Sequence, residues 1–268
     1  MRDELASFPD AGGYLPAGGV TTGPCIGQNG QYRAPQGVGD EDMTSGGGGG
    51  GGSTAGGSGG TIFNGLLFGA GGAAYPNEDL VPLRGGCAGG GLLGYPTVSN
   101  GGSAVQLVSR TQIILSAAAA IDMRAWIADQ GGADPACFGG GSGGNVLLEA
   151  PVVVVGQGAK VLTNGAPGLL RGGGVRTSDD GTPTPGTPCP NPQPAGTRCG
   201  PGGQGAAALG GPTDGGSTQY TSGLTLLMTG GGGGALGYLR INTADGTYTK
   251  ASDVLESAST SAGTLQTR

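Results

Sequence analysis

The stretch 139–165, "GGGSGGNVLLEAPVVVVGQGAKVLTNG", decides the fold prediction, because its apolar strands of Val and Leu lie between glycine tracts. Apolar runs of about four to eight residues bounded by Gly, Asn or Pro are typical of β-strands. The run "VVVV" does not alternate with polar residues, which favours a strand that is covered on both faces. This stretch therefore predicts short, buried strands separated by glycine-rich connections.

A second stretch, "AVQLVSRTQIILSAAAAID" at 104–122, aligns without gaps with 145–163. Self-similarity at a fixed spacing, here about 41 residues, is typical of stacked supersecondary units. The alignment places Val105 opposite Val146, Leu107 opposite Leu148, Ile113 opposite Val154, Ile114 opposite Val155, and Ile121 opposite Leu162.

Each aligned unit is predicted to hold three short strands. The "SAAAAIDMRAWIAD" segment contains good helix formers, so a helical turn around 117–127 stays open as an alternative. The aligned partner contains "VVVV", Pro151 and two glycines, which oppose a helix. The predicted strands are 104–108, 111–115 and 119–123 in the first unit, and 146–149, 152–155 and 159–163 in the second.

Three strands per unit followed by a long glycine-rich excursion predict an all-β protein, an irregular parallel β-solenoid of the β-helix kind. A β-sandwich with disordered glycine-rich insertions is the alternative. For glycine runs such as 46–52, two states stay open: flexible chain, or an extended three-fold helix like polyproline II that stacks closely through its bare faces.

The composition suggests three regions. Residues 1–60 form a Gly/Pro-rich, partly flexible N-terminal segment. Residues 61–250 form the repetitive β domain, with a Pro/Gly-rich insertion at about 172–222. Residues 251–268 form a Ser/Thr-rich tail.

The charge pattern argues against nucleic acid as a partner. The formal net charge is −6, charged residues make up 11% of the chain, and no Lys/Arg cluster is present to follow a phosphate backbone. No apolar run is long enough for a transmembrane helix. The oligomeric state is left open.

The cysteines favour an exported protein. Cys189 and Cys199 flank the Pro-rich segment "PNPQPAGTR", and a disulfide between them would indicate an oxidising compartment. Two unpaired thiols remain the alternative, because spacing alone does not prove a bond. Cys25, Cys87 and Cys137 then allow one further pair and one odd thiol. We expect a secreted or outer-envelope protein, although "MRDELASFPDAGG" is not an export signal.

Four segments resemble the glycine-rich, repetitive surface or secreted proteins predicted in myxobacteria, an uncharacterised family. They are "AAYPNEDLVPLRGGCAGGG", "GGSAVQLVSRTQIILSAAAAID", "GGGSGGNVLLEAPVVVVGQGAKVLTNG" and "GGGGGALGYLRINTADG", which resemble the "ILLEAP…ANG" and "GRIRINT"-like elements of that family. The resemblance covers about 60–268 and implies a β-structured surface protein. It offers no catalytic residues.

The sequence contains little that would indicate a catalytic site. The chain has no histidine, which excludes His-based triads and His-ligated metal sites, and no P-loop or calcium β-roll motif is present. Asp179 and Asp180 lie in a turn-rich linker, and Glu149 lies at a strand end. We therefore predict no enzyme, no catalytic, metal or cofactor-binding residues and no cofactor.

The function expected from the sequence is that of a structural or adhesive protein of the cell surface or extracellular matrix. Its partners would be matrix, polysaccharide or like proteins. Three alternatives stay open: a polysaccharide-binding module, an ice- or surface-ordering protein, and a β-helix polysaccharide lyase or hydrolase. The candidate ligand platforms are Trp126, Arg124, Tyr75 and Tyr95, although lone aromatic residues more often cover a core.

Overall fold

The computed structural model describes eleven stretches of the chain: 24–33, 42–62, 68–76, 78–91, 99–125, 137–169, 182–186, 188, 197–208, 210–218 and 226–265. These residues form strands and no helix, which confirms the all-β prediction. The strands are β1 (Tyr32–Arg33), β2 (Asp42–Thr44), β3 (Ala104–Val108), β4 (Gln112–Leu115), β5 (Ala120–Asp122), β6 (Asn145–Glu149), β7 (Val152–Val155), β8 (Lys160–Leu162), β9 (Thr197–Cys199), β10 (Leu226–Met228), β11 (Tyr238–Thr243), β12 (Thr249–Lys250), β13 (Leu255–Ser257) and β14 (Ser259–Thr264).

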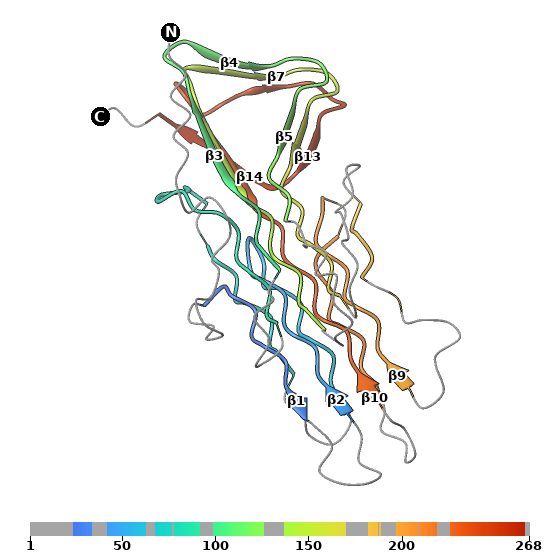
Figure 1. The fold of residues 1–268 in the computed structure, drawn as a ribbon. Helices are drawn as coiled ribbons and strands as arrows, with labels where there is room; N and C mark the ends of the chain where they lie inside the picture. Colours follow the sequence, from blue (N-terminus) through green and yellow to red (C-terminus); the bar gives the residue numbers. More distant parts are fainter. Residues whose placement is uncertain are drawn as a thin grey trace.

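Three parallel sheets form the sides of a triangle at one end of the molecule (Figure 1). Their strand orders are β14-β11-β6-β3, β12-β7-β4 and β13-β8-β5. The chain runs through one strand of each sheet in turn and then returns to the first sheet one level further along. Within these three sheets, strands that follow one another in the chain therefore lie in different sheets, and every pairing is parallel.

The register of the first two levels corrects the ungapped alignment by one residue. Val105 pairs with Val146 and Leu107 with Leu148, as predicted. In the next sheet, however, Ile113 pairs with Val153 and Ile114 with Val154, and in the third sheet Ile121 pairs with Val161. The shift arises at the first corner, where three residues, 109–111, join β3 to β4 but only 150–151 join β6 to β7.

Aliphatic side chains from all three sheets fill the triangle. Val146, Leu148, Val153, Val155 and Val161 of the middle level are all at most 1% exposed. Leu239 and Ile241 of β11 join them from the next level, and partly buried side chains of β3, β4 and β5 pack from the previous one. Apolar burial on this scale is the main favourable term in folding, which explains why these segments lack polar residues on the inner face.

The corner between the second and third strand repeats at two levels as a tight turn. Gly158 has a φ of +70°, and Ala118, its counterpart one level away, has a φ of +62°. The Ala159 N–H donates to the Gly156 carbonyl, and the Ala119 N–H donates to the Ser116 carbonyl. Both turns thus place a residue in the left-handed region, where glycine is the unstrained choice.

Extended glycine-rich segments run side by side from the triangle toward the opposite end of the molecule (Figure 1). Segment 46–52 is buried, and its N–H groups donate in turn to three different neighbouring segments, so that every third residue addresses the same neighbour. The carbonyl oxygens of 46–52 accept hydrogen bonds from N–H groups of further segments, with the same period of three residues. The donor bonds reach segments 25–28, 54–60 and 137–140, and the acceptor bonds come from 69–75, Gly90 and 232–235.

Neighbouring backbones leave no room for a side chain along 46–52. A Cβ placed on Gly46 would overlap the Gly230 carbonyl oxygen, and a Cβ on Gly49 would overlap that of Gly233. A Cβ on Gly48 would likewise overlap the Ala70 carbonyl oxygen. The tracts 139–144 and 230–234 are likewise buried and hydrogen-bonded to other segments. Glycine backbone therefore serves as packed interior in this part of the molecule.

A fourth sheet, β1-β2-β10-β9, lies at the end opposite the triangle (Figure 1). Its pairings are parallel except for the antiparallel pair β1–β2. A disulfide joins Cys25 to Cys87, the further pair that the cysteine count allowed. Cys199 is also disulfide-bonded, whereas its predicted partner Cys189 lies outside the described residues. Cys137 is a fully buried thiol.

Ordered segments also occur in the predicted Pro/Gly-rich insertion at about 172–222 and in the predicted Ser/Thr-rich tail, 251–268. Within 172–222, segment 200–206 joins the glycine-rich interior through bonds such as Gly203 N–H to the Gly231 carbonyl. Within 251–268, β13 and β14 extend two of the three parallel sheets. These segments thus contribute to the same ordered body as the repeated strands.

Candidate functional site

The described residues of the segment 75–84, which are 75–76 and 78–84, cross the outer face of the sheet β14-β11-β6-β3 and are anchored there. Leu80, 1% exposed, packs with Leu147 and Tyr238 of this face. The Tyr238 hydroxyl donates to the Tyr75 carbonyl at 3.0 Å. Asn145 bridges the sheet to the segment, since its amide donates to the Arg84 carbonyl at 2.7 Å and its oxygen accepts from the Tyr238 N–H at 2.9 Å.

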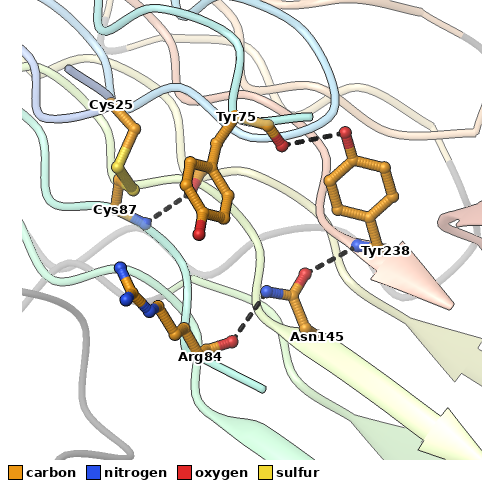
Figure 2. Close-up of a disulfide and its surroundings, with 7 residues drawn as sticks. Cys25, Tyr75, Arg84, Cys87, Asn145 and Tyr238 are labelled. Carbon is orange, nitrogen blue, oxygen red and sulfur yellow. Dashed lines mark hydrogen bonds between the residues drawn. A yellow bond between two sulfur atoms is a disulfide. The ribbon is translucent and has the colours of Figure 1, made fainter. Parts of the chain in front are cut away.

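Figure 2 shows this anchor beside the Cys25–Cys87 disulfide, with Tyr75, Arg84, Asn145 and Tyr238 grouped around it. The Arg84 guanidinium lies over the Tyr75 ring at 6.0 Å from its centroid. The ring of Tyr75, a predicted ligand platform, thus lies next to Arg84, and the backbone carbonyl of Tyr75 holds the start of the crossing segment to the sheet.

A pocket of about 380 Å³ opens between the crossing segment and the sheet. Four of its lining residues come from the segment and three from β11 and β14. They are Pro76, Glu78, Asp79, Val81, Arg240, Asn242 and Thr264. The Ser261 hydroxyl donates to the Glu78 carbonyl at 2.9 Å, which ties the pocket's two sides together.

Arg240 is held rigidly at the base of this pocket. Its Nε donates to the Asn242 Oδ1 at 2.9 Å, and a terminal nitrogen lies 3.2 Å from the Asp79 carboxylate. The guanidinium lies across the bare backbone of Gly263 in β14, where a Cβ would overlap it. The Arg240 side chain is 16% exposed, whereas that of Asp79 is 79% exposed, so the ion pair joins a partly buried cation to a solvated anion.

A row of polar side chains continues from the pocket across the outer face of the sheet. The Asn242 amide donates to one oxygen of Glu149 at 3.2 Å, and the Gln106 amide donates to the other at 2.5 Å. Glu149, at the end of β6, thus accepts hydrogen bonds from both neighbouring strands. This contact network gives Glu149 a bridging role between β3 and β11.

The remaining predicted platform residues do not gather at this pocket. Arg124 forms a two-point contact with Asp122, with nitrogen–oxygen distances of 2.8 Å and 2.6 Å. That side-chain hydrogen bond is the main reason why the pKa of Asp122 lies below its usual value. Trp126, Tyr95 and Cys189 lie outside the described residues.

Sequence reasoning missed Arg240, Asn242 and Asp79. A signal existed for the first two, since "YLRINT" alternates apolar and polar residues and so places Arg240 and Asn242 on one face of a strand. Nothing local connects Asp79 to them, because the contact spans more than half of the chain. In the stretches that the structure describes, no group of three or more Cys, Asp or Glu is arranged to hold a metal ion.

A search of protein-family models finds no match for this chain, and neither do searches of curated proteins and of solved structures. Within the described residues, no helix has the length and apolar character needed to span a membrane. The disulfide is compatible with a protein that resides outside the reducing cytoplasm.

Proposed function

We propose that this chain is a non-enzymatic structural or adhesive protein of the cell surface or extracellular matrix, related to the glycine-rich myxobacterial proteins it resembles. In architecture it would be a β-solenoid of three-sided coils that continues into a lattice of polyglycine II-like segments. The observation that carries the proposal is the burial and mutual hydrogen bonding of the glycine tracts, exemplified by 46–52.

Stiffness follows from the pattern of hydrogen bonds. Segment 46–52 exchanges backbone bonds with neighbours on several sides, so bending it would break bonds in more than one direction. Parallel strands stacked in register add a second rigid unit at the end of this lattice. A stiff body suits a protein that holds other surfaces at a distance, and it needs no reactive side chains.

The disulfide supports a location outside the cell, and the charge bears on the kind of partner. A disulfide across a loop of 62 residues persists in an oxidising compartment. A net charge of −6, with no Lys/Arg cluster in the sequence, argues against nucleic acid as a partner. Since the chain is proposed to act through shape and contact, its partners would be matrix polysaccharide or like proteins.

Antibody labelling of the source organism tests the location. We expect antibodies raised against the folded chain to label intact, non-permeabilised cells or the surrounding matrix. Labelling that appears only after permeabilisation would contradict the proposal. An antibody against a cytoplasmic protein provides the control for cell integrity.

A further inference from the structure

The pocket bounded by the crossing segment and by strands β11 and β14 has the size of a small-molecule site. Its volume of about 380 Å³ lies at the lower end of the range of about 300–1,000 Å³ that is typical of ligand pockets. It is also preformed, because Leu80 and Asn145 anchor the segment and Gly263 fixes the position of the Arg240 guanidinium. A preformed site loses little freedom on binding.

We propose that this pocket binds an uncharged sugar unit of a polysaccharide. The assignment rests on the proposed adhesive role, since it names what the surface would hold. Among the described residues, Asn242 and Asp79 engage two of the five N–H donors that a guanidinium carries, which leaves other donors of this pocket-lining residue for a ligand. The Asp79 carboxylate, exposed beside them, supplies acceptors.

Neighbouring donors and acceptors suit the hydroxyl groups of a sugar. Each hydroxyl both donates and accepts a hydrogen bond, and adjacent ring hydroxyls can therefore bridge the guanidinium of Arg240 and the carboxylate of Asp79. Pro76 and Val81 contribute apolar surface to the same pocket, and Val81 is 72% exposed. Such surface can contact the C–H groups of a pyranose ring while the polar groups set its orientation.

The balance of charge selects against anionic ligands. Two carboxylates, Glu78 and Asp79, line the pocket with one guanidinium, and Glu149 lies behind Asn242. A uronic acid or a phosphate would meet this excess of negative charge. A cationic ligand would be repelled by the Arg240 guanidinium, which already holds the Asp79 carboxylate at 3.2 Å. An uncharged sugar avoids both costs.

Calorimetric titration of the purified full chain tests the assignment. The probes are neutral tetrasaccharides of glucose, galactose or mannose, together with tetraglucosamine and tetragalacturonate as charged counterparts. We expect at least one neutral tetrasaccharide to bind with a Kd of about 1 mM or lower. Asp79→Ala and Arg240→Lys should each weaken this binding about tenfold or more, because the first removes the acceptors and the second removes the planar donor fork.

Asp253→Ala is the matched control, since Asp253 is an exposed carboxylate in the corner between β12 and β13 and should leave binding unchanged. Asp79 is exposed enough that its replacement should not unfold the protein, so it decides the result even if Arg240→Lys is unstable. Absence of neutral-sugar binding at about 10 mM would overturn the assignment. So would binding of the charged probes alone, or neutral binding that both variants leave intact. Because labelling of intact cells does not depend on the pocket, the two proposals can fail separately.

Discussion

At the scale of single residues, the glycines of 46–52 are distinguished by what lies against them. A Cβ on Gly47 would overlap the Gly90 carbonyl oxygen, and one on Gly51 would overlap that of Ala73. These contacts are with backbone atoms, which cannot move aside as a flexible side-chain end can. The glycines are therefore required by packing, and even alanine should be excluded from most of this run.

The variant Gly49→Ala tests this requirement. Its methyl group would overlap the Gly233 carbonyl, so we expect the free energy of unfolding to fall by about 3 kcal/mol or more, at the upper end of overpacking costs. Gly211→Ala is the control, because no atom lies within 4 Å of the added Cβ. Urea unfolding of both variants measures the difference, and equal stability would contradict packed glycine at this position.

Gly158 and Ala118, which occupy equivalent turn positions at two levels, lead to a second prediction. Gly158→Ala should lower the free energy of unfolding by about 1 kcal/mol, because an alanine would be forced into the left-handed region at a φ of +70°. Ala118→Gly should have the opposite effect, with a gain of about 0.5 kcal/mol, because it relieves the same strain. Thermal unfolding of the two variants provides the measurement. Changes of the same sign in both would argue against the turn geometry.

At the scale of elements, β14 protects an edge. It pairs with β11 over six residues, from Tyr238↔Ser259 to Thr243↔Thr264. Its outer face also meets the crossing segment through Ser261. β14 is itself the edge of the sheet, and without it the edge would move from this Ser/Thr-rich strand to β11, whose apolar residues make an exposed edge more prone to aggregation.

Truncation after Ser257 should therefore lower the unfolding midpoint and increase association. Light scattering and urea unfolding of the truncated chain measure these two effects. As a control, a chain truncated after Leu265 retains β14 and should behave like the full chain. A truncated chain that is monomeric and as stable as the control would show that the edge needs no cover.

The strands were predictable because their signal is local. The runs "VVVV" and "QIIL" specify β7 and β4, and the predicted strands of both aligned units lie within one residue of the observed bounds of β3 to β8. The one-residue error in register was not avoidable by an ungapped comparison, since it arises from the different lengths of two corners. Order in the glycine tracts was left open for a physical reason. The backbone packed against Gly49 is that of Gly233, and nothing near either residue identifies the other. The same distance in sequence hid the contact of Arg240 with Asp79.

At the scale of the whole molecule, three ionisable side chains make the free energy of unfolding depend on pH in the alkaline range. Burial raises the pKa of the Cys137 thiol from 9.0 to about 12, partly offset by a backbone hydrogen bond with Thr229. The pKa of Lys250 is raised by its hydrogen bond to Glu256, and that of Tyr248 by burial. Each group holds its proton more tightly in the folded state than in the unfolded state. Raising the pH therefore favours unfolding in all three cases.

We expect the free energy of unfolding to fall as the pH rises from about 9 toward 12, the interval between the two pKa values of Cys137. Cys137 alone can contribute a slope of up to about 1.4 kcal/mol per pH unit. Urea unfolding at a series of pH values measures this slope. The Cys137→Ala variant should be less stable at pH 7, but its free energy of unfolding should fall less steeply as the pH rises. A slope equal to that of the unmodified chain would show that the thiol does not cause the decline.

The most direct measurement of the central claim, that glycine backbone and apolar strands form one ordered body, is amide hydrogen exchange resolved along the native chain. The lattice predicts that amides in 46–52, 139–144 and 230–234 exchange slowly, with protection comparable to that of β6 and β7, because their N–H groups are buried and hydrogen-bonded. Exchange of these glycine amides at the rate of an unstructured chain, with protection confined to the strands, would contradict the account.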